Sequence, residues 1–290
     1  MPKELGKLVE RDVLLLRELG WKAFVQHRRQ CSDFSTLDKF NHHAKRLIRH
    51  YTNRGAPVKF SSKHWTRGRI HRALQRGPHK SCHEHLKFLQ EEFVDMINKQ
   101  QWVIMPASEA LKLSGLRLSP PGCVPQCDRR PRWICDYSFY DVNDETLPLA
   151  ALEAMQFGHA IDRILCEILL ADPNLGPIYL MKIDISDGFY RVNLNIDDMP
   201  KLGVIFPTAP GQEPLVALPL DLPMGWKNSP PVFSTVIDTI ADIANQRIQD
   251  ILYRPPNHHL DDMAHEIPSP YPTIDPSTSD MPSTYPTDDT

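Results

Sequence analysis

Two segments constrain the fold most. One is an apolar stretch that ends at an aspartate, and the other is a glycine-containing turn that precedes an apolar stretch. The run 178–183 is mostly apolar and is followed at once by Asp184. We expect this run to be a β-strand that presents the carboxylate at its end, where it could hold a divalent cation. Downstream, "LPMGWKNSPPVF" (222–233) predicts a turn that enters a helix. The glycine of that turn, Gly225, would let the backbone approach a bound molecule without an intervening side chain.

The order and spacing of these segments resemble two consecutive palm motifs of retrotransposon-type reverse transcriptases, which are RNA-directed DNA polymerases. The resemblance implies that Asp184 is the catalytic, metal-binding aspartate. It also implies that Asp187 and Gly188 form a turn whose backbone amides face the incoming triphosphate. Phe189 falls at the position of an aromatic steric gate, which would exclude a ribose 2′ hydroxyl and so favour deoxynucleotides.

The second motif and an upstream segment extend the resemblance. Gly225 and Lys227 match residues of the templating pocket, whereas Met224 replaces the glutamine of retroviral enzymes. Upstream, "RPRWICDYSFYDVN" (130–143) resembles the fingers segment whose arginine, here Arg132, contacts the triphosphate. The resemblance covers about residues 88–247. It implies an α+β fold with right-hand polymerase fingers and palm, Mg2+ or Mn2+ as cofactor, and an RNA or DNA primer-template and deoxynucleoside triphosphates as partners.

A third palm motif, whose aspartate would complete a two-metal site, lacks a suitable context in this sequence. The only Asp-Asp pair near the expected spacing is Asp261 and Asp262, in "HHLDDMAHE". A palm strand should have β-branched or aromatic residues on both sides, but prolines precede and follow this pair. We interpret the two aspartates as surface residues of a linker. The alternative is that they are the third motif.

Changes in composition predict three parts: a basic helical N-terminal extension (1–87), the fingers and palm (88–254), and a disordered tail rich in Pro, Ser, Thr and Asp (255–290). Helices are expected around residues 8–25, weakened at Gly20, and from Leu86 to Ile97. Another should follow Ser229, which could cap it. Residues 190–206 predict two strands joined by a hairpin, and "SPPG" (119–122) predicts a loop.

Residues 42–87 are strongly basic, with about a dozen Lys and Arg residues against the single acid Glu84. Aromatic residues are interleaved, so the segment could follow a phosphate backbone and stack on exposed bases. The alternative is an ordinary solvated face of surface helices. The candidate nucleic-acid-binding residues are Lys45, Arg46, Arg49, Arg67, Arg69, Arg72 and Arg76.

The cysteine and hydropathy patterns argue against several other functions. Cys123 and Cys127 lack a second pair at the spacing of a zinc ribbon. The segment "HKSCHEH" (79–85) could hold zinc, but a short His-rich stretch in a basic region more often contacts solvent or phosphate. No apolar run is long enough to span a membrane and the start of the chain is charged. We therefore expect no membrane partner and an intracellular location, in the cytoplasm or nucleus.

The sequence predicts a truncated and inactive reverse transcriptase fragment, because 290 residues leave no room for thumb, connection and ribonuclease H domains. One carboxylate, Asp184, cannot by itself clamp two cations, so no polymerisation is expected. The alternative is a nucleic-acid-binding remnant without catalysis. A buried carboxylate pair beside Asp184 would distinguish the enzyme from the remnant.

Overall fold

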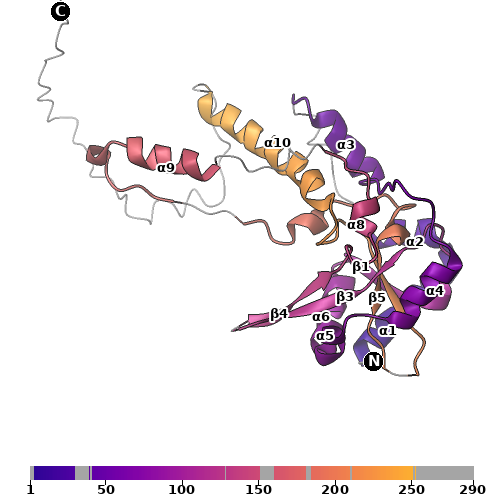
Figure 1. Cartoon of the computed structure of the whole chain (residues 1–290). Helices are drawn as coiled ribbons and strands as arrows, with labels where there is room; N and C mark the ends of the chain where they lie inside the picture. The colour runs from indigo at the N-terminus through magenta and orange to yellow at the C-terminus, as the bar shows by residue number, and fades with distance from the viewer. Residues whose placement is uncertain are drawn as a thin grey trace, which may run out of the picture. The chain divides into compact units, whose positions relative to one another are not determined.

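The computed structural model describes residues 3–29, 39, 41–127, 129–150, 160–180, 184–209, 211–250 and 252. These residues form a mixed α and β structure, as expected from the sequence (Figure 1). Contacts divide the chain into two compact units. The first contains residues 1–156 and 184–246, and the second contains residues 157–183 and 247–290. All of the described strands belong to the first unit.

The first unit is built on a four-stranded sheet in the order β1-β6-β5-β2. β1 (Trp102–Pro106) is antiparallel to β6 (Leu215–Pro219), which is antiparallel to β5 (Gly203–Phe206). The short β2 (Leu118–Ser119) runs parallel to β5. Every residue of β5 and β6 is buried, which explains why both strands are continuous apolar runs in the sequence.

A separate antiparallel hairpin is formed by β3 (Pro121–Gln126) and β4 (Arg129–Cys135), and its far end projects away from the sheet (Figure 1). Trp133 anchors this hairpin. Its ring centroid lies 4.9 Å from Phe93 of α6 (Leu86–Asn98) and 5.0 Å from Trp102 of β1. Phe206 of β5 lies 5.0 Å from Phe93. These edge-to-face contacts bury large apolar surface and fix the base of the hairpin to the sheet.

Helices pack against β1, and those predicted by periodicity are confirmed. α1 (Lys3–Leu19) and α2 (Trp21–Arg28) are separated at Gly20, whose φ is 73°. α1 packs against α6 and β1, so the N-terminal segment shares one hydrophobic core with the strands. The domain boundary after residue 87 stays a prediction.

The remaining elements of this unit are α3 (Lys45–Arg54), α4 (Arg67–Arg76), α5 (Lys80–Glu84), α7 (Ala107–Ala110), α8 (Val142–Glu145), the 3-10 turns η4 (Gly188–Arg191) and η5 (Met199–Leu202), and most of α10 (Ser229–Gln249).

The second unit includes α9 (Ala160–Leu170) and the 3-10 turn η3 (Pro173–Leu175). The strand predicted over 178–183 is wrong for its described part, because residues 178–180 are irregular and their side chains are exposed. A strand needs a neighbour for its backbone groups, and no described residue pairs with these three. Residues 181–183 lie outside the described part of the chain. So do Asp261, Asp262 and the tail predicted to be disordered.

Two further local predictions are wrong. Residues 190–206 do not form a hairpin, because Asn193 and Leu194 make isolated bridges to Asp221 and Ala56 and only 203–206 form a strand. The segment "SPPG" (119–122) is not a loop, because Ser119 ends β2, Pro121 and Gly122 begin β3, and only Pro120 lies between the two strands. α10 begins at Ser229 as expected, but the Ser229 hydroxyl donates to the Pro223 carbonyl (2.6 Å) instead of capping the helix.

The turn before α10 is fixed by the end of β4. Gly225 has a φ of 92°, and a Cβ added there would lie only 2.6 Å from the carbonyl oxygen of Cys135. The side chain of Asn143, in α8, holds the turn from another side. Its Nδ2 donates to the Gly225 carbonyl (3.0 Å) and its Oδ1 accepts from the Lys227 N–H (2.9 Å). Glycine is therefore required by close packing within the protein.

We predict that Gly225→Ala destabilises the protein by at least about 1 kcal/mol more than Gly211→Ala. Both glycines have a positive φ, 92° and 81°, so both substitutions strain the backbone. Only Gly225 has an atom within 4 Å of the added Cβ, so only that site adds a clash with Cys135. Denaturant unfolding of both variants measures the difference. Equal losses of stability would contradict the packing role given to Gly225.

Candidate functional site

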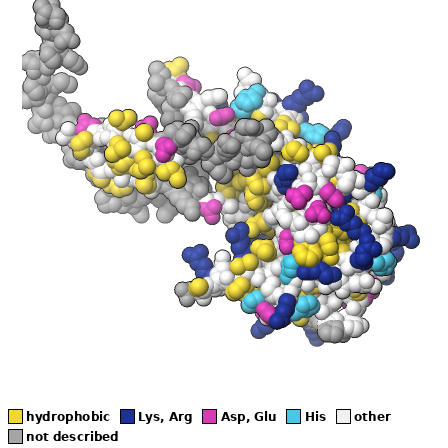
Figure 2. Space-filling view, viewed as in Figure 1, with side chains coloured by type: hydrophobic (Ala, Val, Ile, Leu, Met, Phe, Trp, Pro, Cys, Tyr) yellow, Lys and Arg dark blue, Asp and Glu magenta, His cyan; other side chains and the backbone are white. Residues whose placement is uncertain are grey.

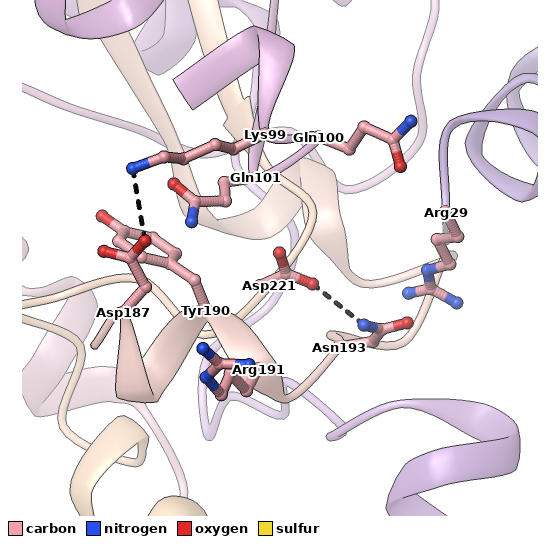
Figure 3. Close-up of a pocket in the computed structure, with 9 residues that line it drawn as sticks. All are labelled: Arg29, Lys99, Gln100, Gln101, Asp187, Tyr190, Arg191, Asn193 and Asp221. Carbon is pink, nitrogen blue, oxygen red and sulfur yellow. Dashed lines mark hydrogen bonds and ion pairs between the residues drawn. The ribbon is translucent and has the colours of Figure 1, made fainter. Parts of the chain in front are cut away.

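The candidate site is a cleft formed where the end of α6, the η4 turn and the segments beside β6 meet. Two adjoining cavities of about 330 Å³ each make up the cleft. They share the lining residues Lys99, Gln101, Asp187 and Tyr190. The first cavity is lined in addition by Arg29, Gln100, Arg191, Asn193 and Asp221 (Figure 3). The second is lined in addition by Phe88, Glu92, Asp95, Met96, Gln126, Arg130, Pro131, Arg132, Trp133 and Met224.

Lys99 and Asp187 face one another where the two cavities join (Figure 3). Lys99 Nζ lies 3.3 Å from Asp187 Oδ2 and 2.9 Å from Asp95 Oδ2. The hydrogen bond to Asp95, together with that to Asp187, raises the pKa of Lys99. Asp187 is in the left-handed region with a φ of 55°, which Asp tolerates better than most residues. The pair therefore places one fixed positive and one fixed negative charge at the centre of the cleft.

Asp221 is the most unusual ionisable group in the cleft. It follows β6 and is only 6% exposed. Burial raises the pKa of Asp221 well above its ordinary value, although the charge of Arg29 and the hydrogen bond from Asn193 act in the opposite direction. Asn193 Nδ2 donates to Asp221 Oδ1 at 3.0 Å (Figure 3). A carboxyl group in such a setting favours its neutral form and can then donate a hydrogen bond to a ligand.

The cleft is polar and carries more positive than negative charge in its first cavity. Arg29, Lys99 and Arg191 supply the positive side chains, against Asp187 and the buried Asp221. Gln101, Tyr190 and Asn193 add neutral hydrogen-bonding groups. This lining offers positive charge and neutral hydrogen-bonding groups to an anionic ligand that also carries polar groups.

The structure brings together some of the residues predicted from the sequence. Arg132 and Asp187 both line the second cavity, and Met224, next to Gly225, lines it too. Lys227 is exposed and its backbone is held by Asn143. Asp184 is exposed and lines neither cavity of the cleft.

Gly188 and Phe189 lie against α10. A Cβ added at Gly188 would lie 2.7 Å from Cζ of Phe233, so this glycine allows close packing of the turn on the helix. The Phe189 ring packs edge-on against the same side chain, with centroids 5.3 Å apart. Neither residue lines the two cavities of the cleft.

The described carboxylates do not fit a two-metal centre. In the part of the chain that the structure describes, no three His, Cys, Asp or Glu side chains are grouped so that they could hold a metal ion. Asp187 is paired with Lys99. The candidate zinc segment is engaged elsewhere: His79 Nε2 lies 3.0 Å from Asp136 Oδ2, and the Cys82 thiol donates to the Pro121 carbonyl.

The basic residues of α3 and α4 fall into two groups. Arg69 is held by Glu145 (3.3 Å) and by the Tyr140 carbonyl (2.9 Å), and Arg76 stacks on the ring of Phe139. Arg46, Arg67 and Arg72 are exposed. Lys45 is partly buried and Arg49 is exposed, and both make interactions of their own. Figure 2 shows Lys and Arg side chains with acidic side chains among them on the side where α3 and α4 lie.

Sequence reasoning missed most of the residues that line the first cavity. They come from segments far apart in the chain, and no local pattern links them. Asp221 had a usable signal, because an acid inside the apolar stretch "LVALPLDLP" is unusual for a surface residue. The residues missed were Arg29, Lys99, Gln100, Gln101, Tyr190, Arg191, Asn193 and Asp221.

No family model matches the chain, and no curated protein matches it either. Among the described residues, no helix is both long and apolar enough to cross a membrane.

We predict that Asp221→Asn changes how stability depends on pH. Because the folded protein holds the proton of Asp221 more tightly than the unfolded chain, this group lowers stability as pH rises above about 4, the ordinary value for Asp. Asparagine can still accept from Asn193 and has no charge to bury. The variant should therefore gain about 0.5–3 kcal/mol at neutral pH and little at pH 3.

Thermal unfolding across this pH range measures the effect. Asp184→Asn removes the same charge from an exposed position and controls for the change in net charge. A loss of stability at neutral pH for Asp221→Asn would contradict the prediction, because it would mean that the carboxylate is stabilising.

Proposed function

We propose that this chain is a fingers and palm fragment of a retrotransposon-type reverse transcriptase whose cleft binds a deoxynucleoside triphosphate without polymerising it. The observation that carries the proposal is the meeting of three motif segments at one cavity. Arg132 is on β4, Asp187 precedes η4, and Met224 precedes the Gly225 turn, yet all three line it. Chance matches at distant points of a sequence have no reason to share a cavity.

The charges and packing of the cleft support binding of a triphosphate. The Arg132 guanidinium is exposed and can form paired hydrogen bonds with phosphate oxygens. Lys99 and Arg130 line the same cavity but are paired, Lys99 with Asp95 and Asp187 and Arg130 with Glu92. Arg132 forms no salt bridge with a described residue, so its charge is available to a phosphate. Asn143 keeps the Gly225 and Lys227 turn in a fixed position next to β4. In this proposal the turn contacts the base through Met224, whereas Phe189 packs against Phe233 outside the two cavities and takes no part in binding.

The proposed activity stops at binding. A complete enzyme of this class would use Mg2+ or Mn2+ to activate the primer hydroxyl and stabilise the leaving group. Asp184 is the one described residue to which the resemblance gives that role, and the described carboxylates do not assemble a two-metal site. The residues of this chain bind and orient the nucleotide in the proposal, and none of them moves a proton.

A second candidate function is nucleic-acid binding without a nucleotide site. It is favoured by the exposed Arg46 on α3 and by Arg67 and Arg72 on α4, which leave charged groups available to phosphates. Such binding would weaken steeply with salt because it releases counterions.

We predict that Arg132→Gln weakens the binding of a labelled deoxynucleoside triphosphate about tenfold or more, the scale of a lost charge-assisted hydrogen bond. Arg129→Gln is the matched control, because Arg129 is exposed on the same strand and does not line the cleft. Fluorescence polarisation of the full chain measures both. Equal effects of the two substitutions would overturn the cleft as the binding site. Salt-sensitive RNA binding with no triphosphate binding would support the second candidate.

We also predict that the chain does not extend a primer. The purified protein would be given Mg2+ or Mn2+, a primed RNA template and deoxynucleotides, with Asp184→Asn as the reference. Extension should not exceed that of the reference, because one carboxylate leaves the reacting oxygens without a two-metal clamp. Extension that disappears in Asp184→Asn would contradict this, and its loss in Asp261→Asn would identify the third motif.

A further inference from the structure

A further cavity, which is separate from the two cavities of the cleft, has a strongly basic lining. Its volume is about 310 Å³, and it shares no lining residue with either cavity of the cleft. It lies between the segment 59–64, the residues just before β2, and η5. Its lining residues are Lys59, Phe60, Ser62, Lys63, His64, Gly115, Arg117, Leu147 and Lys201. No Asp or Glu is among them.

Arg117 forms a fixed part of this cavity. It is only 3% exposed, and its Nη2 donates to Ser62 Oγ (2.9 Å) and to the Lys63 carbonyl (3.1 Å). Its Nη1 donates to Glu145, and its guanidinium lies 3.7 Å from the centroid of the Phe60 ring. These contacts hold the 59–64 segment against the sheet, so the cavity is built from groups with fixed positions.

The charges that remain in the cavity come from its lysines. Glu145 offsets the charge of Arg117, and Asp198 offsets that of Lys201, whose Nζ also donates to the Val58 carbonyl (2.9 Å). Lys59 and Lys63 are exposed, and neither side chain forms a salt bridge with a described residue. These two uncompensated ammonium groups attract an anion, and the engaged Arg117 holds the segment that carries them in place.

The cavity also has an apolar side. Leu147 is 41% exposed at its edge, and Phe60 contributes its ring to the wall. An anion with no apolar part would leave this surface unused. The volume lies at the lower end of the range for small-ligand sites, so it suits a single nucleotide and not a duplex.

We propose that this cavity is a second binding site, which takes the phosphate of a nucleotide, either free or within a single strand. Lys59 and Lys63 contact the phosphate oxygens, and Phe60 and Leu147 contact the sugar or base. The site is independent of the triphosphate cleft, since the two have no residue in common. Ammonium groups bind phosphate oxygens through charge-assisted hydrogen bonds, and bases pack on apolar side chains.

The test uses the full chain and the double variant Lys59→Gln with Lys63→Gln. The control is Lys3→Gln with Lys7→Gln, which removes the same charge from exposed positions on α1. The probes are adenosine 5′-monophosphate, inorganic phosphate and a short single-stranded oligonucleotide. Calorimetry should give binding of the nucleotide or of the oligonucleotide that weakens about tenfold in the Lys59 and Lys63 variant, the scale of a lost phosphate contact. The affinity for the same probe should change less than about twofold in the control variant.

The comparison of probes identifies the source of the phosphate. Tighter binding of the oligonucleotide points to a strand, and equal binding of the monophosphate points to a free nucleotide. Inorganic phosphate that binds as tightly as the monophosphate would overturn the nucleotide assignment. Equal weakening in both double variants would overturn the site itself.

Amide hydrogen exchange distinguishes binding at this site from binding in the cleft. The nucleotide should protect residues 59–64 in the wild type and in Arg132→Gln alike. Protection that appears only around residues 99 and 187–193 would overturn the second site and leave the cleft as the one binding place. Protection of residues 59–64 that survives a failure of triphosphate binding would support the second site alone.

Discussion

The cleft depends on one close contact, the approach of the Gly225 backbone to the carbonyl of Cys135 at the end of β4. Asn143 reinforces this contact with two hydrogen bonds to the turn. Because of it, the hairpin that carries Arg132 and the turn that carries Met224 face the same cavity. The edge-to-face cluster of Phe93, Trp102 and Trp133 supports the hairpin from the sheet side. The geometry of the site thus follows from packing between segments that are far apart in the sequence.

The same packing explains the electrostatics of the cleft. Asp221 lies two residues after the buried β6, and Asn193 pairs with it through an isolated bridge between the two segments. Burial makes the charged form of this carboxyl costly, whereas Lys99 and Asp187 remain half exposed and paired. The cleft therefore combines a neutral, proton-dependent hydrogen-bonding group with a pair of fixed charges. In the proposed function, this combination would favour a ligand with both phosphate and neutral polar groups over a simple anion.

Much of the helical structure could be predicted from the sequence, because periodicity is a local property. The break at Gly20, the buried face of α6 and the start of α10 all follow from such patterns. The strands were harder. A short apolar run such as 178–180 becomes a strand only if a neighbour pairs with it, and the sequence does not contain that information. The cleft shows the same limit, since Arg132 and Asp187 were expected from motifs but Arg29 and Lys99 reach it only through tertiary packing.

The arginines of this chain show why composition alone is a poor guide to a binding surface. Arg69, Arg76 and Arg117 look equivalent to their neighbours in the sequence, yet each has its guanidinium over an aromatic ring, and Arg69 and Arg117 also pair with Glu145. These arginines use their charge to hold loops in place, since a planar guanidinium both stacks and pairs. A lysine ammonium has no planar group that can stack on a ring in this way, and it stays in solvent more often. Lys59 and Lys63 therefore remain available around a frame that arginine has fixed, and the positive charge available to a ligand follows from this division of roles.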